Sequence, residues 1–332
     1  MSTRPSLPLE DLQETLPPAP IGLTRAGVTR SAKSIRISHG DSETLFQAEI
    51  SCFADLNPRQ KGVHMSRFEE GINEAIDEVT AGGALMIDAL AEIIAATVVE
   101  AQGALRSEVT IHASFPVERQ TPVSDMTSQE MYGLIGIAAA GPLGVRRVLG
   151  VSAQGMNACP CAQGLIRAQA EDALAEEGFS SDDIERIVRL VPIATHNQRA
   201  RGTLYVGTPH GVHIPAMTLI DIVEEGMSSE IYELLKRTDE QYIVDRAHRR
   251  PRFVEDSVRE MVKGVLERLP ELGDDTFIRA HQANFETIHT HDVDAERCGT
   301  LGEIRSEIAT GEYHSGHTSL AEWLDGRTAG PV

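Results

Sequence analysis

Two cysteines separated by one proline are the most chemically distinctive feature of this sequence. Cys159 and Cys161 lie within the stretch 158–163, and His196 follows 35 residues after the second cysteine. A thiolate binds soft and borderline metals and also acts as a nucleophile. A structural zinc finger would need a second close cysteine pair, which the sequence lacks, so the pattern favours a catalytic metal site with an open position. The alternative is that both cysteines are small, buried core residues.

A second group of ionisable side chains lies near the end of the chain. Glu286, His289 and His291 fall within the short stretch 284–292. On a regular strand the two histidines share a face and the glutamate points the other way, so all three converge only if a bulge or turn intervenes. A carboxylate and two imidazoles near a metal can hold a substrate, move protons and position water. The alternative is an ordinary surface hairpin.

Three further residues gain their interest from these neighbours. A lone His196 would be a surface or core histidine, and Glu240, just past an expected helix, would be a solvated acid. Glu255 precedes an expected helix, where the helix dipole favours a negative charge. The same carboxylate can accept two parallel N–H bonds from the edge of a guanine or pterin ring.

The charge balance excludes several classes of partner. The 332 residues include 30 Lys and Arg against 50 Asp and Glu, a formal net charge of -20, with lysine far rarer than arginine. Such a surface repels nucleic acid and anionic membranes. Adaptation to high salt explains the excess of acid, whereas a GC-rich genome explains only the missing lysines. In so acidic a chain, the basic residues beside the motifs are candidates for a phosphate site, with ordinary surface charge as the alternative: His64, Arg67, Arg199 and Arg201.

Other sequence features indicate the compartment of the protein and the kinds of motif that it lacks. The sequence has no apolar run long enough for a transmembrane helix, and its first residues lack the apolar region of a signal peptide. Four cysteines in a chain of this length do not make a disulfide framework. No Walker A or dinucleotide-binding glycine motif is present. We therefore expect a cytoplasmic protein with free thiols.

Hydrophobic patterning predicts strand, strand, helix, helix, strand, strand in the first half. Ser66 is expected to cap the first of these helices, with Glu69 in the capping-box position. The expected strands are 26–39 and 42–55 around a turn at Gly40 and Asp41, followed by helices at 67–79 and 84–102 and by strand pattern at 107–118 and 131–153.

The second half begins inside that last strand and is predicted to follow a similar plan. The tail beyond Thr300 is expected to contain a weak helix at 303–309 and a loose end. The other expected helices are 162–177, 181–190, 215–226, 228–237 and 253–269, and the expected strands are 202–206 and 276–291.

Five motifs together resemble the type IB GTP cyclohydrolases, over roughly residues 22–294. They are Gly62-Val-His-Met-Ser-Arg-Phe68, Cys159-Pro-Cys161, Thr195-His-Asn-Gln-Arg199, Lys236-Arg-x-Asp-Glu240 and Glu286-x-x-His289-x-His291. The resemblance implies an α+β tunnelling fold (T-fold) of two tandem β-β-α-α-β-β modules with antiparallel sheets. It also implies a homotetramer with active sites at subunit interfaces. The modules would be 22–130 and 131–300, the second carrying the metal site, between an extended leader at 1–21 and a C-terminal tail at 301–332.

The resemblance also implies roles for single residues. Cys159, His196 and Glu240 would bind the metal, with Fe(II) expected first and Mn(II) or Zn(II) as alternatives. Glu255 would anchor the guanine, and Cys161 would be an auxiliary thiol. The side chains around the imidazole ring of GTP, where they move protons, would be Glu286, His289 and His291. Water activated by the metal would attack C8, the ring would open, and a second hydrolysis would release formate.

The long stretch between Cys161 and His196 and the acidic composition are similar to the archaeal enzymes of methanopterin biosynthesis. Those yield 7,8-dihydroneopterin 2′,3′-cyclic phosphate, whereas bacterial members of this pterin and folate chemistry yield 7,8-dihydroneopterin triphosphate. Two remoter alternatives stay open. One is a T-fold nitrile reductase with a cysteine nucleophile and NADPH, and the other is a non-catalytic metal-binding oligomer.

Overall fold

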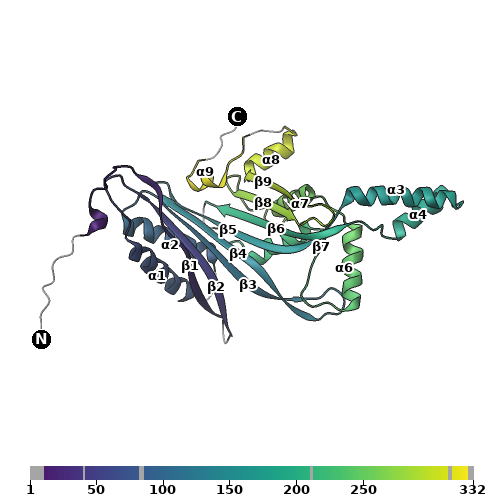
Figure 1. Cartoon of the computed structure of the whole chain (residues 1–332), viewed down its shortest axis with the longest axis horizontal. Coiled ribbons are helices and arrows are strands. Elements are labelled where there is room, and N and C mark those ends of the chain that lie inside the picture. The colour runs from purple at the N-terminus through teal and green to yellow at the C-terminus, as the bar shows by residue number, and fades with distance from the viewer. Residues whose placement is uncertain (1–10, 40–41, 82–85, 210–211, 313–315, 328–332) are drawn as a thin grey trace. The chain divides into compact units, whose positions relative to one another are not determined.

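The computed structural model describes residues 11–39, 42–81, 86–209, 212–312 and 316–327 (Figure 1). Residues 1–10 of the expected leader, the expected turn at Gly40 and Asp41, and the expected helix start at 84 lie outside the described residues. The strands are β1 (Leu23–His39), β2 (Ser42–Leu56), β3 (Ser107–Gln120), β4 (Thr127–Gly141), β5 (Gly144–Ala158), β6 (Asn197–Thr208), β7 (Ser229–Glu230), β8 (Phe277–Asn284) and β9 (Val293–Thr300). The helices are the 3-10 turn η1 (Leu12–Glu14), α1 (Met65–Ala81), α2 (Ile87–Gln102), α3 (Pro160–Glu176), α4 (Ser181–Leu190), α5 (Ala216–Gly226), α6 (Arg237–Arg249), α7 (Val254–Arg268), α8 (Leu301–Thr310) and α9 (Leu320–Leu324).

The strands hydrogen-bond in the order β1-β2-β3-β4-β5-β6-β8-β9, and β7 pairs with β5. The pairs β1–β2, β5–β7, β6–β8 and β8–β9 are antiparallel. The expected α+β class with an antiparallel sheet is therefore confirmed. The chain divides into two compact units, unit 1 (Met1–His112 and Gly136–Arg147) and unit 2 (Ala113–Ile135 and Val148–Val332). No helix in the described ranges is both long and apolar enough to cross a membrane.

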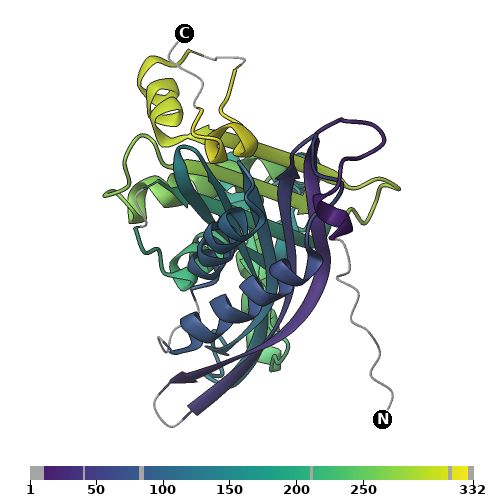
Figure 2. The same cartoon turned by 90° about the vertical axis from the view of Figure 1, so that its left-hand side faces the viewer.

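In unit 1, helices α1 and α2 pack on each other and on the β1–β2 hairpin (Figure 2). Helix α2, which was predicted at 84–102, buries an apolar face, with Leu90, Ile94 and Val98 all inaccessible to solvent. Alternate residues of β2 are buried too, as the two-residue period of a strand requires. Cys52 is one of them, and burial raises the pKa of its thiol to about 12, so it is a core residue rather than a reactive one.

The predicted cap of the first helix is wrong. Helix α1 begins at Met65, so Ser66 lies inside it. Glu69 does not close a capping box but accepts hydrogen bonds from Ser31 Oγ at 2.8 Å and Lys33 Nζ at 2.7 Å, both on β1. The bond from Lys33 lowers the pKa of Glu69. The carboxylate therefore ties α1 to the hairpin instead of to its own first turn.

In unit 2, α5 and α7 pack on each other, α5 also contacts β6, and α7 contacts β8 and β9. The predicted helix at 303–309 is confirmed as α8, but the packed helix α9 was not expected. Trp323 of α9 is fully buried, its indole N–H donates to the Asp275 carbonyl at 2.8 Å, and its ring lies 5.8 Å from Phe277. The loose end predicted for the chain falls on residues 328–332, outside the described part.

The helix predicted at 228–237 is wrong. Ser229 and Glu230 form β7, which pairs with β5, and α6 starts only at Arg237. The N–H groups of Glu233 and Leu234 donate to side chains of β4, at 3.0 Å and 3.2 Å, so they are not available for a helix. Helix α6 was missed, and Glu240 lies in its first turn rather than just past a helix.

Two predicted strands have different limits. The strand pattern at 131–153 belongs to two strands, β4 and β5, joined by a turn at Pro142 and Leu143. The strand predicted at 276–291 ends at Asn284, and a bend over 285–292 leads into β9, which was not predicted. That bend is the interruption that Glu286, His289 and His291 need if they are to converge.

Gly136→Ala is expected to destabilise unit 1. A Cβ at Gly136 would lie 2.3 Å from the carbonyl oxygen of Ile87 in the first turn of α2, so strand and helix would have to separate. Overpacking of this kind costs about 1–3 kcal/mol. Urea unfolding should show a lower midpoint. Gly164→Ala is the control, because no atom lies within 4 Å of a Cβ there and alanine favours a helix by about 1 kcal/mol. A parental midpoint for Gly136→Ala would contradict the close packing.

Candidate active site

A cavity of about 400 Å³ in unit 2 brings together residues from four separate segments. The candidate residues that line it are Cys159, His196, Glu255, Glu286, His289 and His291. They come from the end of β5, the start of β6, the first turn of α7 and the bend between β8 and β9. The other lining residues are Gln198, Arg252, Phe253, Val254, Asn284, Val293 and Asp294. The fold thus assembles six of the residues that the sequence singled out.

Cys159 and His196 are adjacent although helices α3 and α4 lie between them in the chain. The N–H of Cys159 donates to the His196 carbonyl at 3.1 Å, and Thr195 Oγ1 donates to the Cys159 carbonyl at 2.8 Å. Figure 1 shows α3 and α4 as a helical pair that extends away from these two ends. Cys159 is partly buried and Cys161 is exposed, so they are not a pair of buried core residues.

His196 and Glu286 leave polar atoms unsatisfied inside the cavity. Gln198 Nε2 donates to Glu286 Oε1 at 2.9 Å, while His196 Nδ1 lies 3.7 Å from Glu286 Oε2. Both of these latter atoms are buried, and neither has a hydrogen-bond partner among the described residues. Buried polar atoms without a partner are rare and costly. A thiol, an imidazole and a carboxylate that line one cavity fit the donor set of a transition metal.

The bend between β8 and β9 presents the two histidines. Phe285 N–H donates to the Arg199 carbonyl of β6 at 2.9 Å, which continues the pairing of β8 with β6 by one residue. The chain turns after it, where Glu286 N–H donates to Asp292 Oδ1 at 3.1 Å. The rings of His289 and His291 then stack, with centroids 5.1 Å apart. Both histidines are exposed, as a surface hairpin would have them, and both line the cavity.

The remaining candidates lie elsewhere. Cys161, Arg199, Arg201 and Glu240 are exposed and do not line this cavity. The Arg201 guanidinium lies 5.7 Å from the centre of the Phe285 ring.

His64 and Arg67 belong to unit 1. His64 Nε2 lies 2.9 Å from Glu14 Oε1 of the leader, and Arg67 donates to the Ala101 carbonyl at 2.9 Å. Asp11, Glu14 and His64 are the one group of three potential ligand atoms within 4.8 Å of one another in the described chain. Cys159, His196 and Glu240 do not form a group that compact.

Asp239, which sequence reasoning passed over, anchors the helix that carries Glu240. Its fully buried carboxylate accepts from the N–H groups of Val123, Ser124 and Lys236 and from Ser124 Oγ, at 2.6–2.9 Å. Burial alone would raise the pKa of Asp239, but these hydrogen bonds, led by that of Ser124, hold it well below its usual range. The available signal was its place inside the motif Lys236-Arg-x-Asp-Glu240.

Comparison with known proteins identifies the family. A family model described as "Type I GTP cyclohydrolase folE2" matches residues 9–295. The chain is 38% identical over 308 residues to the GTP cyclohydrolase MptA of Methanococcus maripaludis, covering 90% of this chain and 98% of that protein. It is 39% identical over 305 residues to the MptA of Methanothermobacter thermautotrophicus, covering 90% and 95%. The chain belongs to the type I GTP cyclohydrolase family.

A solved structure supports the fold of this family member. The uricase of Arthrobacter globiformis is similar with a TM-score of 0.54, over 91% of this chain and 98% of that one. At 8% identity the likeness shows the fold alone.

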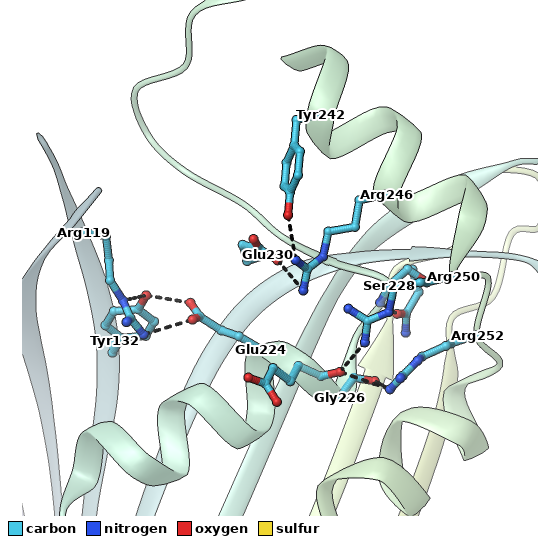
Figure 3. Close-up of polar contacts among 12 residues, drawn as sticks. Arg119, Tyr132, Glu224, Gly226, Ser228, Glu230, Tyr242, Arg246, Arg250 and Arg252 are labelled. Atoms are coloured by element: carbon cyan, nitrogen blue, oxygen red, sulfur yellow. Dashed lines mark hydrogen bonds and ion pairs between the residues drawn. The ribbon is translucent and has the colours of Figure 1, made fainter. Parts of the chain in front are cut away.

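A second cavity of this cyclohydrolase-family chain, about 300 Å³ and also in unit 2, is lined mainly by charged residues. Figure 3 shows Tyr132 and Arg119 meeting Glu224, with hydrogen bonds of 2.6 Å from the phenol and 3.0 Å from the guanidinium. Glu230 and Arg246 pair nearby at 3.3 Å. Burial raises the pKa of Glu224 to about 7, against the lowering effects of Tyr132 and Arg119.

Glu224→Gln is expected to flatten the pH dependence of folding. The folded chain favours protonated Glu224, so its contribution is fully present below pH 4.5 and is lost as the pH rises through 7, by at most about 3 kcal/mol. Chemical unfolding at pH 5 and pH 8 measures the difference. The exposed neighbour Glu225, paired with Arg268, gives the control Glu225→Gln, which should keep the parental slope. An unchanged slope in Glu224→Gln would contradict the raised pKa.

Proposed function

We propose that this chain is a GTP cyclohydrolase that hydrolyses GTP at C8, opens the imidazole ring and releases formate. The observation that carries the proposal is that Cys159, His196, Glu255 and Glu286 line one cavity. The alternative function, a nitrile reductase, would use a cysteine nucleophile. It would not need the unpartnered imidazole and carboxylate beside that cysteine. The family match over residues 9–295 favours the cyclohydrolase.

A metal would be held by Cys159 and His196, with Glu240 as the third ligand. Support for the first two comes from their shared cavity and from the unpartnered Nδ1 of His196. The place of Glu240 rests on the family resemblance, since it lies outside the cavity in the single chain. Fe(II) is the expected ion, and Mn(II) or Zn(II) accept the same donors. When bound, the ion supplies Lewis-acid activation of water for attack on C8.

The cavity residues divide the remaining work. Glu255 stands exposed in the first turn of α7 and accepts the two N–H groups along one edge of the guanine. Gln198 holds Glu286 Oε1, which leaves Oε2 to take a proton from the attacking water. His289 and His291 deliver protons to the ring nitrogens as the imidazole opens. Arg199, Arg201, His64 and Arg67 bind phosphate, and Cys161 is auxiliary.

The fold would be a tunnelling fold of two modules, 22–130 and 131–300, assembled as a homotetramer with active sites at subunit interfaces. The element order supports this plan. The first half runs β1-β2-α1-α2-β3-β4, where β4 continues past residue 130 to Gly141. The second runs β5-β6-α5-α7-β8-β9 once α3–α4 and β7–α6 are set aside as insertions. The candidates that the single chain leaves outside the cavity would then be completed by a neighbouring subunit.

The product would be 7,8-dihydroneopterin 2′,3′-cyclic phosphate, formed in a cytoplasm of high salt. The similarity to two archaeal proteins named MptA and the net charge of -20 support this choice. The alternative product is 7,8-dihydroneopterin triphosphate.

Anaerobic incubation with GTP and Fe(II) or Mn(II), at low and molar salt, tests the proposal by mass analysis of the products. Formate with a cyclic phosphate is the expected result, and removal of the ion by a chelator should abolish both. Formate with a triphosphate would assign the bacterial type of reaction. Tight metal binding without formate under every condition would favour the non-catalytic oligomer.

Glu255→Gln is expected to raise KM for GTP about 100-fold, because the neutral amide accepts only one of the two N–H bonds and its N–H₂ group opposes the second guanine N–H. Steady-state kinetics with the metal-loaded enzyme measures the change. Glu267→Gln, on the same helix and exposed beside Lys263, is the control and should leave KM unchanged. Equal effects of the two substitutions would contradict guanine binding by Glu255.

A further inference from the structure

A fully buried carboxamide lies directly behind the cavity. Asn157, the last residue but one of strand β5, has no exposed surface. Its Nδ2 donates to Ser257 Oγ and to Asn284 Oδ1, each at 3.0 Å, and its Oδ1 accepts the N–H of Ser228 at 2.9 Å. Ser228 Oγ in turn accepts the N–H of Ala158 at 3.2 Å. One side chain thus connects four segments of unit 2.

The positions of these contacts match the positions of the cavity residues. Asn157 is two residues before Cys159, Ser257 is two residues after Glu255, and Asn284 is two residues before Glu286. The two contacts of Nδ2 span 100 and 127 residues of sequence. Backbone bonds also join these segments, through β6 in the sheet and from the Arg252 N–H to the Ala158 carbonyl at 2.9 Å. Asn157 adds a buried side-chain contact to both of the other two segments at once.

We infer that Asn157 is a positioning residue of the active site. Its carboxamide fixes the segments of Cys159, Glu255 and Glu286 relative to one another. The inference rests on the proposed function for the roles of those segments. Asn157 does not line the cavity, so it acts through the residues that do.

The network also fixes the orientation of Asn284, which does line the cavity. The N–H of Ser228 can only donate, so the oxygen of Asn157 must face it and the nitrogen must face Asn284. Asn284 Oδ1 therefore accepts, and it accepts a second bond from Gln282 Nε2 at 3.3 Å. The group that Asn284 has left to offer a ligand is Nδ2, an N–H donor. We expect it to meet a carbonyl oxygen of the bound base.

Such a network could serve stability alone, and kinetics separate the two roles. Displacement of reacting groups by about 1 Å costs about 100-fold in rate. Asn157→Ala should therefore lower kcat/KM for GTP about 100-fold in the metal-loaded enzyme. Ser107→Ala is the control, because it deletes another buried hydrogen bond, 2.6 Å to the Ala95 carbonyl, in unit 1. It should lower the unfolding midpoint but leave kcat/KM unchanged.

Ser257→Ala tests the contact to a single segment, helix α7. It removes the contact to the helix of Glu255 and keeps the one to Asn284, so it should raise KM about tenfold with kcat near the parental value. Asn157→Asp serves if Asn157→Ala does not fold. It keeps the size and the acceptor for Ser228 but loses the donor to Asn284, and it should also lower kcat/KM. Parental kinetics in Asn157→Asp or Asn157→Ala would overturn the inference.

Hydrogen exchange tests, without turnover, whether Asn157 holds the three segments in place. In Asn157→Ala the amides around Cys159, Glu255 and Glu286 should all exchange faster, and in Ser107→Ala none of them should. Faster exchange in only one of the three segments would overturn the inference. If the parent protein releases no formate from GTP, the proposed function fails, while the exchange result still decides whether Asn157 holds the three segments together.

Discussion

The hydrogen bond from the Cys159 N–H to the His196 carbonyl is the contact on which the rest of the site depends. It closes a long excursion of the chain that contains α3 and α4, and it returns the imidazole to the thiol. Thr195 adds a second bond across the same base. Gln163 Nε2, in the first turns of α3, adds two more to the carbonyls of Ile193 and His248. Because the closure lies entirely at the base, the length of the helical pair does not enter the geometry of the cavity.

The polar groups behind the cavity are hydrogen-bonded to one another, whereas two polar atoms inside it have no hydrogen-bond partner among the described residues. The deep layer of Asn157, Ser228 and Asn284 is joined by hydrogen bonds that use both polar atoms of the Asn157 amide, the Ser228 hydroxyl and the Asn284 oxygen. The next layer outward leaves His196 Nδ1 and Glu286 Oε2 without partners, 3.7 Å apart. Buried polar atoms without a partner are costly, and these two, an imidazole nitrogen and a carboxylate oxygen, are also potential metal ligands. A group bound between or beside them would offset their desolvation, so the arrangement favours an occupied cavity over a purely structural one.

The sequence predicted local patterns well and long-range pairing poorly. The helices expected at 84–102 and 181–190 depend on apolar periodicity and caps within a few residues, and both are found as α2 and α4. The stretch 228–237 has a helical composition, but it does not form a helix. Part of it pairs with β5, and its later N–H groups donate to side chains of β4. The strand expected to reach residue 291 ends at Asn284, because the N–H of Glu286 bonds to the Asp292 side chain and the chain turns away from β6. The β4 partners of the stretch 228–237 lie more than 100 residues away, so its own composition does not predict them.

The candidate site divides in the same way. The motifs around Cys159 and His196 could be recognised from short spacings, whereas Asn157 and Asp239 look like ordinary polar residues until their partners are seen.

The arginines of unit 2 also differ in whether their charge is paired, which the sequence alone does not show. Arg119 and Arg252 are committed to acids and to carbonyls at the end of α5. Arg199 and Arg201 are exposed, and neither has an acidic partner among the described residues. In a chain of net charge -20, an arginine that keeps its charge uncompensated is available to an anion. Its attraction for a phosphate would be screened in concentrated salt, so binding there would depend more on short, direct hydrogen bonds than on the long-range field.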